Sequence, residues 1–272
     1  MSEQECLWSA TTLIDMACGT AKGLVEWNKR TIAEVAFDSF KSLGVFVEEK
    51  DREGAVKYLL GKYWDNLEKA AARGTEVHTF AEQMALGVDV SFDPAVQPYV
   101  TQYLRFLDDF KPEFVMAESP VYNLTRRYAG TLDAIAKIDG QTVVMDMKTT
   151  AHGPNAKTPA GNPKSRPPFK EVALQLTLYR HAELVGLLAD RREVNYKRYY
   201  AFDPTAQHEP MPETDGAVCL VISPEDYMLV PVRSDGEVWT YVRHMLQMAK
   251  WEDETSKIVF GPPISPRQEV AA

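Results

Sequence analysis

The spacing of apolar and polar residues changes along this chain, and the change comes near residue 112. Before it, apolar side chains recur at every third or fourth position, which is the spacing of an amphipathic helix. This spacing predicts helices over 8–42 in two pieces, over 53–72, over 75–86 and over 94–110. Gly74 is expected to separate the helices on either side of it, because glycine destabilises a helix interior. Gly87 is expected to cap the next helix end.

Beyond residue 112 the apolar runs are shorter, and several alternate with polar residues as half-buried strands do. They predict strands over 113–123, 196–202, 217–222 and 227–232, a hairpin within 130–150, and helices over 169–188 and 236–251. This order predicts an α/β protein, with a mixed β-sheet core flanked by helices and an N-terminal helical subdomain. We expect a helical region over 1–112, the core over 113–255 and a flexible tail over 256–272.

The hairpin, GTLDAIAKIDGQTVVMDMKTT, carries the main chemical signal of the sequence. Asp139-Gly140 favours a two-residue type I′ turn. That turn would place Asp133 opposite Asp146, with both side chains on one face of the sheet. Lys148 lies two residues beyond Asp146 and therefore points the same way. Two carboxylates and an ammonium are thus expected on one patch.

Such a patch is a candidate site for a divalent cation with an adjacent general base. Carboxylate oxygens of Asp133 and Asp146, with the backbone carbonyl of Met147, form a ligand set that hard cations prefer. Lys148 could orient or deprotonate an attacking water, whose pKa a bound cation lowers. The alternative is a solvated strand face with a cross-strand ion pair, and the hairpin alone leaves both interpretations open.

Two helical positions could complete this site. His78 follows Gly74, and a neutral imidazole can join two carboxylates around a metal. Gln175 and Tyr179 are four residues apart, so they share one helix face and could hydrogen-bond to phosphates or bases. Taken singly, these residues are better explained as a surface or core histidine, an exposed glutamine and a buried tyrosine.

Composition narrows the class of protein. The 272 residues carry a net charge of −9, which argues against nucleic-acid binding through bulk charge but allows a local basic groove. Cys6, Cys18 and Cys219 are too few for an iron–sulfur cluster or a four-cysteine zinc site. Scattered thiols fit a reducing compartment, so we expect a cytoplasmic protein. An acidic, polar N-terminus and the lack of long apolar runs predict no signal peptide and no membrane partner.

A local basic groove has its own candidate residues. The proline-rich segment 151–168 is expected to form an irregular loop between the two halves of the site. Cations in or beside it, and just before the hairpin, are Lys157, Lys164, Arg166, Lys170, Arg126 and Arg127. They would form a rim that contacts phosphates and makes binding salt-dependent. A solvated linker is the alternative for the loop.

Taken together, these motifs resemble the RecB-like, Cas4-like branch of the PD-(D/E)XK nuclease superfamily, which includes phage-type exonucleases. The resemblance spans about residues 74–180. It rests on four motifs in the order that this branch has, which are Gly74 with His78, Gly130 to Asp133, Asp146 to Lys148, and Gln175 to Tyr179. Cluster-bearing members add four cysteines that this chain lacks, so the cluster-free phage-type enzymes are the nearer resemblance. It implies a restriction-endonuclease-like core.

The resemblance also implies roles for individual residues. His78, Asp133 and Asp146, with the Met147 carbonyl, would ligate Mg²⁺ or Mn²⁺, and Lys148 would position the hydrolytic water. Gln175 and Tyr179 would hold a DNA strand near the scissile phosphate. Glu118, in the strand before the hairpin, is an outer-shell or second-metal candidate.

The function expected from this resemblance is a metal-dependent DNA exonuclease that hydrolyses phosphodiester bonds in recombination, repair or phage DNA processing. Its partner would be DNA, as single strands or ends, with phage or host recombination proteins as further candidates. Two alternatives stay open. One is a non-catalytic DNA-binding or assembly protein on the same fold, and the other is an endonuclease of the resolvase or restriction type.

Overall fold

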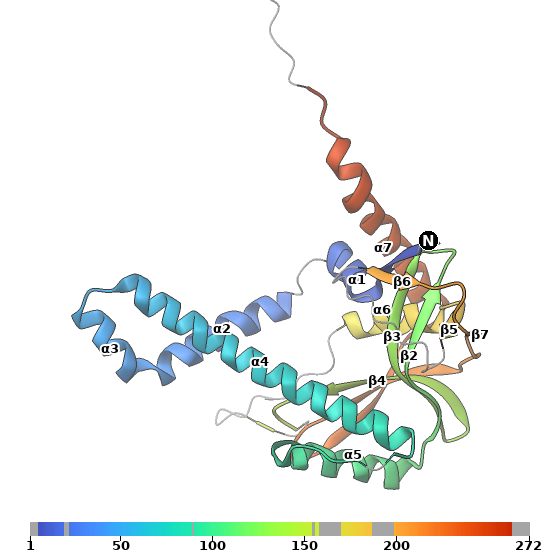
Figure 1. Cartoon of the computed structure of the whole chain (residues 1–272), viewed down its shortest axis with the longest axis horizontal. Helices are drawn as coiled ribbons and strands as arrows, with labels where there is room; N and C mark the ends of the chain where they lie inside the picture. The colour runs from blue at the N-terminus through green and yellow to red at the C-terminus, as the bar shows by residue number, and fades with distance from the viewer. Residues whose placement is uncertain are drawn as a thin grey trace, which may run out of the picture.

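The computed structural model describes residues 5–18, 22–88, 90–153, 156–157, 170–186 and 199–262. In this part of the chain a mixed sheet of nine strands lies at the centre, with helices on both faces (Figure 1). Its strands are β1 Glu5–Ser9, β2 Glu113–Asn123, β3 Tyr128–Ile138, β4 Gln141–Thr149, β5 Leu184–Gly186, β6 Tyr199–Phe202, β7 His208–Pro210, β8 Gly216–Ile222 and β9 Tyr227–Val232. Their order is β7-β5-β2-β3-β4-β8-β9, with β1 paired to β3 and β6. The predicted α/β class, with a mixed sheet flanked by helices, is confirmed.

Each face of the sheet has its own helical layer and apolar core. The helices are α1 Ala10–Cys18, α2 Lys22–Asp38, α3 Phe40–Glu48, α4 Arg52–Ala85, α5 Gln97–Phe110, α6 Glu171–Arg180 and α7 Gly236–Lys250, with short turns at Pro94–Val96, Trp251–Thr255 and Ser256–Ile258. Val144 of β4 packs with α1, α6 and α7, whereas its neighbours Val143 and Met145 pack with α4 and α5. This alternation is what a strand buried on both faces requires. None of the helices described is both long and apolar enough to cross a bilayer.

The β3–β4 hairpin forms as the sequence predicts. Its antiparallel register runs from Ala134 opposite Met145 to Ile138 opposite Gln141. Asp139 and Gly140 have φ angles of 49° and 77°, and two positive φ values in succession define the type I′ turn. Beyond Ala134 the pairing of β3 with β4 ends, whereas β4 pairs in parallel with β8 from Val143 to Thr149. The separation opens a fork at the level of Asp133.

The prediction of a helix break at Gly74 is wrong. It is a single helix of 34 residues that passes through Gly74 and ends at Ala85. Gly74 lies over the end of β4, where a Cβ would be 3.5 Å from Oγ1 of Thr149. One glycine costs a helix only about 1 kcal/mol, and the burial of Val77 and Phe80 outweighs that cost. Gly87, with φ at 68°, follows the helix end as expected.

Two other helix predictions are wrong at their ends. Residues 5–9 form strand β1, so the helix expected from residue 8 begins only at Ala10, and β1 pairs in parallel with β3 and antiparallel with β6. The N-terminal stretch therefore belongs to the sheet. The expected division at residue 112 assigns it to a helical region instead. The helix expected over 169–188 ends at Arg180, and β5 follows it and pairs with β2 and β7. The predicted strands 113–123 and 227–232 are confirmed as β2 and β9.

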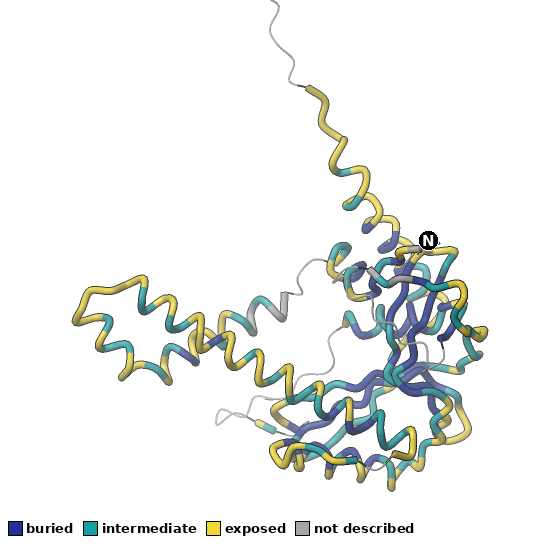
Figure 2. The backbone as a smooth tube through the Cα atoms, in the orientation of Figure 1, coloured by how far each residue is buried: buried dark blue, intermediate teal, exposed yellow. Residues whose placement is uncertain are grey.

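Helices α2 and α3 and the first part of α4 form an arm that projects from the sheet (Figure 1). Most of the arm is exposed, in contrast to the strands (Figure 2). Tyr63 of α4 is one of its few buried side chains, and its hydroxyl donates to Oδ1 of Asn28 on α2 at 2.9 Å. The second half of α4 leaves the arm and runs across the sheet, where it carries His78 to the fork of the hairpin.

Candidate metal centre

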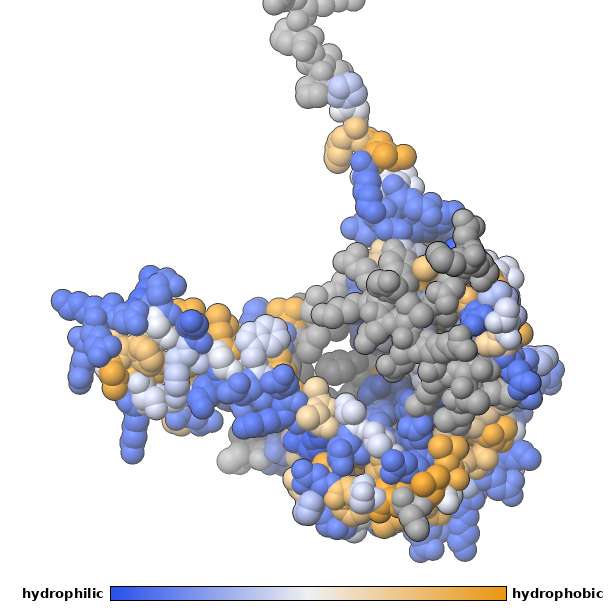
Figure 3. Space-filling view, in the orientation of Figure 1, coloured by the Kyte–Doolittle hydropathy of each residue, from blue (hydrophilic) through white to orange (hydrophobic). Residues whose placement is uncertain are grey.

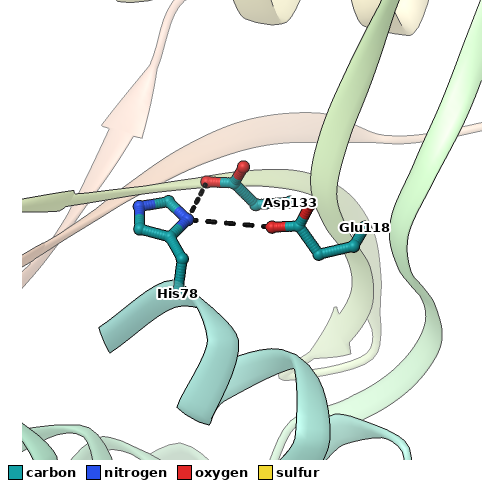
Figure 4. Close-up of side chains that lie close together, drawn as sticks. All are labelled: His78, Glu118 and Asp133. Atoms are coloured by element: carbon teal, nitrogen blue, oxygen red, sulfur yellow. Dashed lines mark ion pairs between the residues drawn. The ribbon is translucent and has the colours of Figure 1, made fainter. Parts of the chain in front are cut away.

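Three side chains from three elements meet at the fork (Figure 4). His78 comes from α4, Glu118 from β2 and Asp133 from β3, and their ligand atoms all lie within 4.8 Å of one another. Nδ1 of His78 is 3.6 Å from Oδ2 of Asp133 and 3.8 Å from Oε1 of Glu118. All three side chains are partly exposed, so solvent reaches the cluster. An imidazole nitrogen and two carboxylate oxygens at this spacing can share one cation with small side-chain adjustments.

Glu118 owes its position to an unusual backbone conformation. Its φ angle is 44°, in the left-handed region that residues with a Cβ seldom adopt. The neighbouring pairs, Ala117 with Ala134 and Ser119 with Leu132, place Glu118 opposite Asp133 across the β2–β3 ladder. Left-handed backbone in a strand costs free energy and is concentrated at functional sites. The conformation is therefore consistent with a role that needs the Glu118 carboxylate beside His78.

Asp133 lies in the gap that opens between β3 and β4. Its Oδ2 atom accepts the backbone N–H of Met147 at 2.6 Å, in place of a ladder hydrogen bond from β3. Burial raises the pKa of Asp133 to about 6, and the nearby Asp146 carboxylate adds to this, while His78 and Lys148 oppose it. The N–H and C=O of one strand residue point to the same side. The Met147 carbonyl therefore faces the Asp133 side, as its expected role as a ligand requires.

The pKa of His78 responds to the same carboxylates. Burial alone would lower it, but the hydrogen bond that the imidazole donates to Glu118 and the charge of Asp133 outweigh burial, and the pKa of His78 is raised. The carboxylates thus favour the protonated form of His78. A divalent cation would compete with that proton, because it binds the neutral imidazole and the ionised carboxylates.

Asp146 and Lys148 form an ion pair next to this cluster, in which Asp146 is buried and Lys148 is partly exposed. Asp146 is 2% exposed, and Nζ of Lys148 donates to its Oδ1 atom at 2.7 Å. The Lys148 side chain is 42% exposed, so one ammonium both neutralises Asp146 and reaches solvent. Burial would lower the pKa of Lys148, but Asp146 and Asp133 raise it, and the lysine stays protonated. Asp146 lies outside the close group of His78, Glu118 and Asp133, and Lys148 donates to one of its oxygens.

Cys219 is a neighbour of Asp146 that no sequence motif indicated. It lies opposite Asp146 in the parallel β4–β8 ladder, and its Sγ atom is 3.8 Å from Oδ2 of Asp146, within reach of a weak S–H hydrogen bond. Burial and the Asp146 charge raise the pKa of Cys219 to about 12. The two Asp146 oxygens are thus held by different groups, the ammonium of Lys148 and the thiol of Cys219.

Gln175 and Tyr179 lie on α6, and the structure separates their roles. Tyr179 is 4% exposed, its hydroxyl accepts from Nε2 of Gln175 at 3.0 Å, and its ring packs against Gly130. The expected contact of Tyr179 with a DNA strand does not fit this burial, whereas Gln175 is half-buried and accessible. No sequence motif indicated Tyr200 of β6, whose hydroxyl is 3.3 Å from Oγ1 of Thr131, two residues before Asp133 on β3.

The structure describes only part of the predicted basic rim. Arg126 and Arg127 lie at the β2–β3 turn, and Arg127 is six strand residues, or about 20 Å, from Asp133. The Arg127 guanidinium donates to the Cys6 carbonyl at 3.3 Å, so it ties β1 to the turn. Lys157 is exposed. Lys164 and Arg166 lie outside the described residues.

The comparisons with known proteins leave the family open. No protein-family model matches the sequence. No curated protein matches it either. Among solved structures, one match is a chain described as "Crystal structure of SSO0001". The matched region covers 91% of this chain and 75% of that chain, at 10% sequence identity and a TM-score of 0.32. A similarity of this degree supports neither a fold family nor a function.

Proposed function

We propose that this protein is a metal-dependent DNA exonuclease of the RecB-like PD-(D/E)XK type, with the β2–β3–β4 strands and α6 as a restriction-endonuclease-like core. The observation that supports the proposal is the meeting of His78, Glu118 and Asp133 within 4.8 Å, beside the ion pair of buried Asp146 with Lys148. An ordinary solvated strand face would not bury a carboxylate to 2% exposure or hold a non-glycine residue at positive φ for the sake of surface charge.

The residues of the site fit a divalent cation such as Mg²⁺ or Mn²⁺. His78, Glu118 and Asp133 would hold it, with Asp146 and the Met147 carbonyl as further oxygen ligands. When bound, the cation would act as a Lewis acid on the phosphate and lower the pKa of its water. The nitrogen ligand favours Mn²⁺ more than an all-oxygen site would, because imidazole suits transition metals.

The chain's own groups would orient the water and the phosphate. Lys148 is protonated and partly exposed, so its ammonium can donate to the attacking water or to a phosphate oxygen and stabilise developing negative charge. Its hydrogen bond to Asp146 fixes the direction of the ammonium. Gln175 is the accessible member of the α6 pair, and its side-chain amide would contact the DNA backbone while buried Tyr179 supports it.

Digestion of end-labelled DNA tests this proposal. The full-length protein is incubated with linear single-stranded, linear duplex and covalently closed circular DNA, each with Mg²⁺, Mn²⁺ or EDTA. We expect degradation of linear DNA that requires the cation, and reductions of about a thousandfold in Asp133→Asn and Lys148→Ala. Lys137→Ala is the matched control, because Lys137 lies on the same hairpin but pairs with Glu113 at the surface.

The outcomes separate the alternatives. Cleavage of closed circles would make the protein an endonuclease. Absence of cleavage with every cation, together with DNA binding, would reject the nuclease and favour a binding or assembly protein. Isothermal titration with Mn²⁺ adds an independent readout, because a nuclease site predicts binding that Asp133→Asn weakens and Lys137→Ala does not.

A further inference from the structure

The arm exposes more large apolar side chains than its own core can cover. The arm comprises α2, α3 and residues 52–72 of α4, and Val35 and Tyr63 are the only buried residues among those described there. Phe37, Phe40 and Trp64 are 83%, 77% and 62% exposed. Apolar surface lies between the charged side chains of the arm in the space-filling view (Figure 3). Exposed aromatic residues in this number mark surfaces that bind a partner.

The apolar residues of α4 in the arm follow a symmetric pattern. Residues four positions apart form a ridge on the surface of a helix. In this part of α4 the ridge consists of Arg52, Val56, Leu60, Trp64 and Glu68. All five are exposed. The middle of the ridge is apolar, and its two ends carry opposite charges. If two such ridges pack antiparallel, the positive end of each meets the negative end of the other, and the two apolar centres are in contact.

We infer that a second copy of this chain docks on the arm, with the two α4 ridges packed antiparallel about a two-fold axis at Leu60. Leu60 then contacts Leu60 of the second copy, Val56 contacts Trp64, and Arg52 pairs with Glu68. Each contact occurs twice, as a two-fold interface requires. Ridges formed by every fourth residue are also the surfaces through which helices most often pack.

A glycine beside the axis supports a close approach of the two helices. Gly61 follows Leu60 on the exposed side of α4, and a Cβ built there would have no atom within 4 Å. The fold of one chain therefore gives no reason for a glycine at this position, although glycine destabilises a helix interior. Two helices that cross at Leu60 would benefit from the missing side chain, because small residues let backbones approach closely.

The distribution of charge favours a second copy over nucleic acid. Residues 22–72 contain nine Lys or Arg and nine Asp or Glu, so the arm is neutral, while the whole chain carries −9. Two copies that meet through their arms bring together their least charged parts and keep the acidic remainder apart. A surface that binds DNA without sequence preference would instead be basic.

Reversal of the charges at the ridge ends tests the pairing in the full-length protein. We expect a dimer by sedimentation equilibrium and light scattering. Arg52→Glu and Glu68→Arg should each weaken the dimer, and the double variant should restore it, because the pairs re-form with exchanged signs. Leu60→Lys should raise the dimer dissociation constant about 30-fold or more, through the lost apolar contact and like-charge repulsion at the axis. Lys62→Glu, on the opposite side of α4, is the control and should leave the dimer unchanged.

A cross-link provides the geometric test. In a Cys6→Ser, Cys18→Ser background, Leu60→Cys should form a disulfide between two copies under mild oxidation, because only a residue at the axis meets itself. Lys62→Cys should not. A monomeric wild-type protein, a double charge reversal that fails to restore the dimer, or equal cross-linking at both positions would overturn the inference. All altered residues are exposed, and far-UV circular dichroism verifies that each variant is folded.

Discussion

Tyr179 lies so close to Gly130 that a Cβ at position 130 would be 2.5 Å from Cε1 and 3.0 Å from the hydroxyl oxygen of Tyr179. The contact joins the strand that carries Asp133 to the helix that carries Gln175. A glycine is required at this point because the two elements approach through the missing side chain. The spacing of two motifs far apart in the sequence is thus set by one packing contact.

We expect Gly130→Ala to destabilise the protein by about 2 kcal/mol, because the methyl group forces the buried Tyr179 ring to shift. Chemical denaturation measures the change. Gly216→Ala on β8 is the matched control and should change stability by less than about 0.5 kcal/mol, since its Cβ would only touch Val143 at 3.9 Å. Tyr179→Leu should relieve part of the cost of Gly130→Ala, and equal costs in both backgrounds would show that the contact is not the cause.

Metal-free protein should lose stability as the pH rises through the range in which Asp133 titrates. Its pKa is raised from 3.8 to about 6 in the folded state. The contribution to stability is therefore present below pH 4 and is lost by about pH 6, and its size is on the order of 3 kcal/mol. The raised pKa of His78 acts in the same direction, because its stabilising proton is also lost as the pH rises.

Mn²⁺ should reverse this loss, and more strongly at pH 7.5 than at pH 5, because protons compete with the cation for the same ligands. Thermal unfolding with EDTA or Mn²⁺ at each pH measures the difference. In Asp133→Asn both the pH dependence and the Mn²⁺ effect should shrink. An equal effect of Mn²⁺ on wild type and Asp133→Asn would place the cation elsewhere.

The three cysteines should differ in reactivity at pH 8. Cys219 is buried with its pKa raised to about 12, so hardly any thiolate forms there, whereas Cys6 and Cys18 are exposed. We expect iodoacetamide to modify Cys6 and Cys18 in the native protein and Cys219 only after unfolding, as mass spectrometry of peptides would show. Rapid native modification of Cys219 would mean that the β4–β8 region opens at Asp146.

Arg180 should be a strong anchor of α6. Its guanidinium donates to Oγ1 and the carbonyl of Thr214 and to the carbonyl and Oγ of Ser234, so one side chain connects α6 to the loops before β8 and α7. We expect Arg180→Met to cost about 2–4 kcal/mol in chemical denaturation, because these carbonyls lose charged donors. Arg233→Met is the control, because the partners of Arg233 are exposed carboxylates, and it should cost much less than Arg180→Met.

The parts of the fold that depend on local chemistry could be predicted from the sequence. Asp139-Gly140 determines its own turn, and that turn determines the register that brings Asp133 towards Asp146. The continuity of α4 through Gly74 could not be predicted, because packing of Val77 and Phe80 on the sheet outweighs a local penalty. Strand β1 likewise depends on partners more than a hundred residues away.

The same distinction applies to the candidate metal centre. His78 and Asp133 were predicted and do come together, because each lies in a motif that the sequence displays. The position of Glu118 beside His78 and Asp133 depends on the positive φ angle of Glu118, which the sequence of β2 does not predict. Cys219 reaches Asp146 through the parallel pairing of β4 with β8, a long-range register that the sequence of an apolar strand does not encode.

Because α4 is continuous through Gly74, it fixes the distance between the ridge in the arm and His78. A rise of about 1.5 Å per residue puts His78 about 27 Å along the axis from Leu60. Under the proposed two-fold pairing, two metal centres would stand about 54 Å apart, a span of about sixteen base pairs of B-form DNA. Such a pair could not cut both strands of a duplex at one place. Each centre would work on a strand end of its own, and one unbroken helix would set the distance between the two ends.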